Sequence, residues 1–189
     1  MAQQTNFLYL NNLMRMLWEQ HAAWTRMTII SIAEGLADEE VTTQRLLRNP
    51  GDIAAVFRCY YGNQIADCLK NLLTEHLILA SQLIKAVKAC DTTAAADIER
   101  RWYANGEQIV TFLSRINPYW SRETMLNLWR VHLDQVKAQA VARLNKNYAL
   151  DIYYYDIGEL HLLHMADELT QGIVRQFPQC FTFNFKMNL

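Results

Sequence analysis

The chain has 189 residues, of which 51% are hydrophobic, and its formal net charge is -1. A chain of this length usually forms one domain, so residues 1–189 are predicted to form a single domain with a continuous core. The near-zero charge excludes a broad basic field, so neither nucleic acid nor a membrane surface is an expected partner. Six Gly and three Pro are few, which favours long helices over a sheet with many turns.

The N-terminal segment MAQQTNFLYLNNLMRMLWEQ lacks the basic and apolar regions of a secretory signal, and no stretch has the uncharged length of a membrane span. The four cysteines form no CxxC motif and no Cys/His pair at zinc-finger spacing. These features predict a soluble cytoplasmic protein whose cysteines are reduced, with most of them acting as packing residues.

Apolar residues recur at helical spacing over most of the chain, which predicts an all-α fold, an up-down bundle of four to five long helices. A long connection with one or two short helices is expected over residues 36–62, which contain polar clusters and the turn sequence Asn-Pro-Gly. The tail, residues 178–189, carries three phenylalanines and is predicted to pack onto the bundle. The long helices are predicted over Asn6 to Glu34, Asn63 to Ala89, Asp91 to Ile116, the stretch after Ser121, and Asp151 to Phe177.

Each predicted helix carries a polar residue on the side that its apolar residues mark as inward. These residues are His21, His76, Asn105 and His132 in the first four helices. In the last helix the predicted inner side holds Tyr153, Asp156, Ile157, Leu160, Leu163, His164 and Asp167. Burial of such groups costs several kcal/mol unless they pair, hydrogen-bond or hold a metal, so these residues need partners.

The spacing of these residues predicts that they meet at one depth, because residues equally far from a connecting turn of an antiparallel bundle stand at the same height. His132 and His164 are symmetric about Tyr148, and Asn105 is related in the same way to His76 and to His132 across two other turns. The predicted layer therefore contains His76, Asn105, His132 and His164. His21 lies midway along its helix, but its level cannot be counted across the long connection.

Imidazoles that converge from facing helices are typical of metal sites in bundles. The predicted ligands of a divalent metal (zinc, iron or manganese) are His21, His76, His132, His164 and Asp167. Asp156 or Asp167 would act as the base if the metal activates a water molecule. Asn105, Tyr153 and Thr25 are expected to orient the ligands or to face a small-molecule ligand.

Two other interpretations of the same residues remain. They could form a metal-free polar network that fixes helix register in a structural or partner-binding bundle, or two of the histidines could hold haem. His161 points about 60° away from His164 and is expected at the surface. No phosphate-binding loop or nucleophile elbow is present, so a kinase or dehydrogenase is not supported.

Several segments resemble those of a group of bacterial all-helical proteins with no established activity. They include LWEQHAAWTR, RNPGDIAAVFRCYYG, LLTEHLILA, INPYWS and LHMADELTQGIVRQFP. The predicted architecture is also similar to metal-binding bundles of the DinB kind, in which three histidines hold a divalent metal. Those bundles carry an HxxxH pair on one helix, whereas this chain has His161 and His164 three residues apart. The resemblances imply an all-helical fold and a metal site, and they imply no particular reaction.

Overall fold

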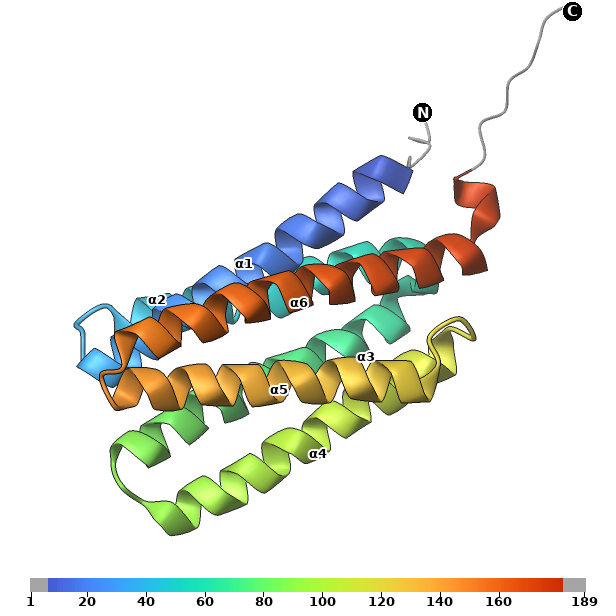
Figure 1. The fold of residues 1–189 in the computed structure, drawn as a ribbon. Coiled ribbons are helices and arrows are strands. Elements are labelled where there is room, and N and C mark those ends of the chain that lie inside the picture. The colour runs from blue at the N-terminus through green and yellow to red at the C-terminus, as the bar shows by residue number, and fades with distance from the viewer. Residues whose placement is uncertain (1–6, 182–189) are drawn as a thin grey trace, which may run out of the picture.

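The computed structural model describes residues 7–181 and confirms the predicted all-α bundle, with no strand among these residues (Figure 1). Helix α6 packs between α1 and α5, and α4 packs against α3 and α5. The short helix α2 lies against α1. The helices are α1 (Phe7–Glu34), α2 (Glu39–Leu46), α3 (Asn49–Lys88), α4 (Thr92–Ile116), α5 (Arg122–Leu144), α6 (Tyr148–Gln176) and the 3-10 turn η1 (Pro178–Cys180).

Side-chain caps begin the last three long helices. Asp91 accepts a hydrogen bond from the backbone N–H of Ala94, and Ser121 accepts one from Thr124, so both predicted caps are confirmed. Asn147 caps α6, which therefore begins at Tyr148, three residues before the predicted start.

The predicted connection over residues 36–62 is more helical than expected. It contains α2 and the first part of α3, which joins the predicted helix after Gly62. Gly62 has φ 79° and ψ 177°, a conformation that side chains rarely adopt, so α3 bends sharply there. The bend places the start of α3 beside the middle of α1.

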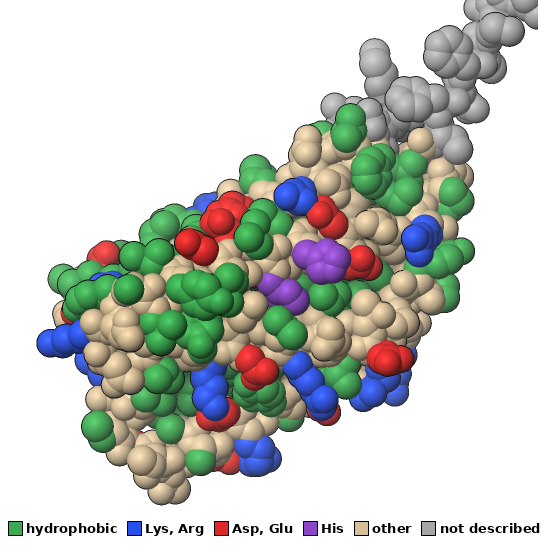
Figure 2. All heavy atoms as spheres, viewed as in Figure 1, with side chains coloured by type: hydrophobic (Ala, Val, Ile, Leu, Met, Phe, Trp, Pro, Cys, Tyr) green, Lys and Arg blue, Asp and Glu red, His purple; other side chains and the backbone are tan. Residues whose placement is uncertain are grey.

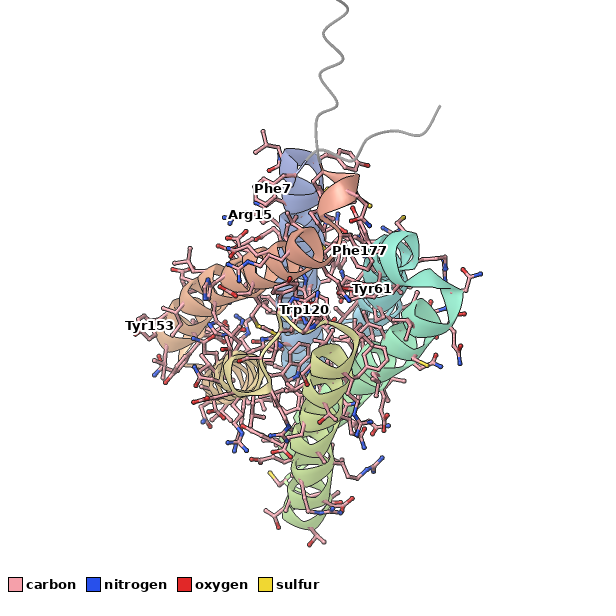
Figure 3. The ribbon with its side chains drawn as sticks, turned by 90° about the vertical axis from the view of Figure 1, so that its right-hand side faces the viewer. Phe7, Arg15, Tyr61, Trp120, Tyr153 and Phe177 are labelled. Carbon is pink, nitrogen blue, oxygen red and sulfur yellow. The ribbon has the colours of Figure 1, made fainter. Side chains whose placement is uncertain are left out.

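Helix α6 is rotated relative to the prediction. Leu160 is 67% exposed and Tyr153 is 56% exposed, and Figure 3 shows Tyr153 pointing outward. The buried residues of α6 include Leu162, Met165, Ala166, Leu169, Gly172 and Ile173. Helix α6 carries apolar residues around most of its circumference, so their spacing alone could not identify the side that packs.

Small residues set the contact face of α6. The indole of Trp120 occupies the space where a β-carbon at Gly172 would stand, and its Nε1–H donates to the backbone oxygen of Glu168 at 3.3 Å. Trp120 and Phe57 are both fully buried, with ring centres 5.8 Å apart. A large flat ring thus packs directly onto a helix backbone, which requires glycine at that position.

The expected packing role of the cysteines is wrong for most of them, because Cys59, Cys68 and Cys90 are exposed. All four cysteines are free of disulfides in the structure. Within residues 7–181, no helix is both long and apolar enough to cross a membrane. The predicted packing of the tail beyond Phe181 falls outside the described residues.

Candidate functional site

Three buried histidines from three helices lie next to one another in the core. His132 of α5 is in the middle, with its ring centre 5.7 Å from that of His21 in α1 and 6.0 Å from that of His76 in α3. His132 is 2% exposed, and the other two are similarly buried. The inward positions that helical spacing predicted for these histidines are therefore confirmed.

Two of these histidines are held by asparagines in the same way. Nδ1 of His76 lies 3.0 Å from Oδ1 of Asn105, and Nδ2 of Asn105 donates to the backbone oxygen of Leu72. His21 is held likewise by Asn49, whose amide donates to the backbone oxygen of Leu17. In each case that carbonyl belongs to the residue four positions before the histidine.

These hydrogen bonds determine which ring nitrogen carries the proton. A backbone oxygen can only accept, so it must face the amide –NH2 of the asparagine, and the amide oxygen then faces the imidazole. That oxygen accepts from Nδ1–H, which leaves a lone pair on Nε2 of both His21 and His76. A metal-binding imidazole shows the same pattern, with one nitrogen bound to a fixed acceptor and the other free to bind the metal.

Tryptophan rings separate the histidines from solvent. Trp102 stacks on His76 at 5.3 Å between ring centres, Trp18 lies 5.5 Å from His21, and Trp129 contacts His76 and His132. All three tryptophans are buried. This apolar enclosure strengthens electrostatic interactions inside it and penalises an unpaired charge.

Burial keeps the imidazoles neutral. It lowers the pKa of His76 to about 3, with a further contribution from His21, and the hydrogen bond to Asn105 opposes the shift only in part. Burial also lowers the pKa of His21, and it lowers that of His132 well below the usual value, assisted by the neighbouring histidines. Neutral imidazole is the form that binds metals, so no proton has to be displaced from these rings at neutral pH.

A small cavity adjoins two of the histidines between α1, α5 and α6. Its volume is about 20 Å³, enough for one water-sized group. Its walls include His21, Thr25, His132, Gln135, Tyr155 and Glu159.

Several polar atoms around this cavity lack a hydrogen-bond partner among residues 7–181. They are Oγ1 of Thr25, Nδ1 of His132 and Oε1 of Gln135. Nε2 of His76, which does not line the cavity but belongs to the neighbouring ring, also lacks a partner. Because buried polar groups normally find a partner, such a concentration indicates a site for water, an ion or a small ligand.

A pair of carboxylates lies beside the cavity. Glu159 accepts a hydrogen bond of 2.8 Å from the hydroxyl of Tyr155. Burial and the nearby Glu159 raise the pKa of Glu19. Two acidic side chains in contact favour a cation or a shared proton between them.

Two of the predicted metal ligands do not reach the histidines. His164 is exposed, so its predicted core position is wrong, and Figure 2 shows histidine side chains on the outside of the bundle near acidic residues. Asp167 is paired instead with Arg15 at 2.5 Å. Both errors follow from the rotation of α6.

Of the other predicted site residues, some lie near the histidines and some do not. Thr25 lines the cavity and Asn105 holds His76, whereas Asp156 and Tyr153 are exposed and face away from the core. His161, predicted at the surface, is half-buried and donates from Nε2 to the backbone oxygen of Leu128 at 2.8 Å.

The sequence interpretation missed Asn49, Gln135 and Glu159. Asn49 precedes a proline and was assigned to a turn, although it is buried in the first turn of α3. Within residues 7–181, no group of three or more His, Cys, Asp or Glu side chains is arranged to hold a metal ion.

A second buried polar centre, around Asp151, was also missed. Asp151 is 0% exposed in its side chain and accepts two hydrogen bonds from Arg26, at 2.8 and 3.2 Å. Arg143 and Gln139 also donate to its carboxylate, at 3.4 and 3.1 Å. With every lone pair of the carboxylate engaged by side chains, this centre joins α1, α5 and α6 structurally.

Comparison with protein-family models, with curated proteins and with solved structures found no match for this chain.

Proposed function

We propose that the protein binds a divalent transition metal, namely zinc, iron or manganese, at His21, His76 and His132. The ion would hold or activate a small polar ligand in the cavity between α1, α5 and α6. His164 and Asp167 are not part of this proposal, because neither reaches the three histidines.

The observation that carries the proposal is the fixed tautomer of His21 and His76. Each asparagine occupies Nδ1–H, so each histidine keeps a lone pair on Nε2 in the core, on either side of His132. The two arrangements leave the same ring nitrogen free, and a shared metal ion would bind that nitrogen of both histidines. The unpartnered nitrogen of His132 adds a third donor.

Two of the three distances between the rings are close to those of a tetrahedral site. With metal–nitrogen bonds of about 2.1 Å, two imidazole centres bound to one zinc ion stand about 5.3 Å apart. The pairs here stand 5.7 and 6.0 Å apart. For these two pairs metal binding would need a contraction of less than about 1 Å, together with rotation of the rings. His21 and His76, which lie on either side of His132, would also have to approach each other.

The cavity gives the proposed site a place for a ligand. A bound divalent ion supplies Lewis acidity to a small polar group in its open position. Glu159 on the cavity wall is placed to accept a proton there, the role first assigned to Asp156 or Asp167. Gln135 and Thr25 offer oxygen atoms that would orient that group.

Elemental analysis of protein purified without a histidine tag tests the proposal. Wild-type protein is expected to carry near-stoichiometric metal, and His132→Gln is expected to lose it. His164→Gln is the matched control, because it removes an exposed histidine and should leave the metal content unchanged. Circular dichroism of each variant verifies that it is folded.

Two results would contradict the proposal. One is wild-type protein that contains no metal and whose melting temperature does not respond to added zinc, iron or manganese. The other is equal metal content in the two variants.

A metal-free network that fixes helix register is the second candidate. The two His–Asn pairs favour it, because each ties the middle of one helix to another helix. It predicts that chelators leave the melting temperature unchanged and that mutation of either asparagine loosens the bundle.

A further inference from the structure

An open groove of about 590 Å³ runs along the surface between the N-terminal half of α1 and the first part of α3. Apolar side chains dominate its walls, including Leu13, Met16, Leu17, Val56, Cys59 and Tyr60. The far end is polar and holds Gln20, Arg48 and Asp52. An exposed apolar groove with one polar end is typical of a binding surface.

The last described residue stands at the apolar end of the groove. The ring of Phe181 stacks on Tyr60 with 5.9 Å between centres, and Phe177 packs on Tyr60 and Tyr61. Figure 3 shows Phe177, Tyr61 and Trp120 gathered at this end of the bundle. The chain therefore leaves the described part of the molecule beside the groove.

The residues that follow have a strict alternating pattern. Phe181 is followed by TFNFKMNL, so every second residue is apolar: Phe183, Phe185, Met187 and Leu189. In an extended chain these side chains point the same way as that of Phe181. The residues between them are polar, with Lys186 the only charged one.

The first five residues of this segment match the length of the groove. From Tyr9 to Gln20, α1 extends about 16 Å, and five extended residues after Phe181 cover about the same distance. The segment has a single apolar face, and the groove is apolar where the segment begins. Burial of two or three large side chains would offset the cost of ordering a few residues.

We propose that residues 182–186 dock in extended form in the groove between α1 and α3, with Phe183 and Phe185 on its apolar walls. This interaction is independent of metal binding. It would cover the apolar side chains of α1 that line the groove.

Disulfide trapping tests the proposal, because the groove contains a native thiol. In a background with Cys68, Cys90 and Cys180 changed to serine, Phe183→Cys is expected to form an intramolecular disulfide with Cys59 under mild oxidation. The matched control keeps Cys68 and changes Cys59 to serine. Cys68 is also exposed on α3 but lies outside the groove, so trapping there should be at least about tenfold slower.

The oxidised products separate the possible occupants. A monomeric disulfide supports the proposal. Disulfide-linked dimers alone would overturn it, because the groove would then hold the tail of a second copy. Equal trapping at Cys59 and at Cys68 would also overturn it.

A pair of double variants with equal added charge gives a second readout that does not depend on cysteine. Phe183→Asp with Phe185→Asp changes the apolar face, whereas Thr182→Asp with Asn184→Asp changes the polar face. If the segment covers the groove, only the first pair should raise the fluorescence of an apolar dye, by about threefold or more. No increase in either, or the same increase in both, would overturn the proposal.

Discussion

Oδ1 of Asn105 lies 3.0 Å from Nδ1 of His76 and leaves the other nitrogen of that ring with a lone pair. Asn49 repeats this relationship with His21 on a different pair of helices. The two asparagines thus set the protonation pattern of the core, whether or not a metal binds.

Asn105→Ala is expected to destabilise the fold by about 3 kcal/mol, because it leaves Nδ1–H of His76 unpaired in the core and removes the second hydrogen bond of the Leu72 backbone oxygen. Asn49→Ala should cost a similar amount, and urea unfolding measures both.

Asn105→Asp should instead raise the pKa of His76 from about 3, because a carboxylate favours the imidazolium. Nitrogen chemical shifts of the ring followed against pH would reveal this change, and an unchanged pKa would show that the residues are not in contact.

Acidification should destabilise the protein before most carboxylates titrate. The buried histidines have lowered pKa values in the folded state and the ordinary value of about 6.5 when unfolded. The unfolded chain therefore binds more protons below pH 6.5, so stability is complete above that pH and is lost progressively toward pH 3. His76 alone should cost about 2 kcal/mol between pH 7 and pH 5.

Urea unfolding at pH 7 and pH 5 measures this loss. His164→Gln should lose as much stability as wild type, because His164 is exposed, whereas His76→Gln should lose less. Equal losses in the two variants would show that His76 does not carry the pH dependence.

The sequence was sufficient to place His21, His76, Asn105 and His132 inside the bundle. Each sits in a regular apolar stripe whose opposite side is polar, so helical spacing determines its direction. Helix α6 has no such contrast. Its packing face is marked by small residues such as Ala166 and Gly172, which receive side chains from neighbouring helices and carry little hydrophobic signal.

That difference explains which parts of the candidate site were misjudged. His164 and Asp167 were placed inward because Leu160 and Leu163 suggested a stripe, although the buried face lies around Leu162 and Met165. Glu159 was missed for the same reason. Asn49 could not be identified as a core residue, because its contact with His21 depends on where the bend at Gly62 directs α3.

Asp151→Asn should destabilise the protein by about 3 kcal/mol. The carboxylate is fully buried and binds two arginines that are about one-fifth exposed, so an amide of the same shape leaves their charge poorly compensated. Asp167→Asn is the matched control. It breaks an ion pair with Arg15 that is more exposed on both sides and should cost at most about 1 kcal/mol.

Urea unfolding at neutral pH compares the two variants directly. Similar losses would mean that the burial of Asp151 adds nothing to its pairing. A larger loss for Asp167→Asn would contradict the assignment of Asp151 as the centre that joins α1, α5 and α6.

Gly172→Ala should destabilise the bundle by about 3 kcal/mol, because the added methyl group would overlap the indole of Trp120, which cannot move without losing its bond to Glu168. Gly158→Ala in the same helix is the matched change. Its methyl group would meet only Gln135, at 3.8 Å, so it should gain about 0.5–1 kcal/mol from better helix propensity. Urea unfolding gives the sign of each effect.

In a double-mutant cycle, Trp120→Phe should cost less stability in the Gly172→Ala background than in the wild-type background, because the smaller ring relieves the overlap. If the two alanine variants have the same stability, Trp120 does not pack on Gly172 and the contact between the α4–α5 turn and α6 must differ from the one described.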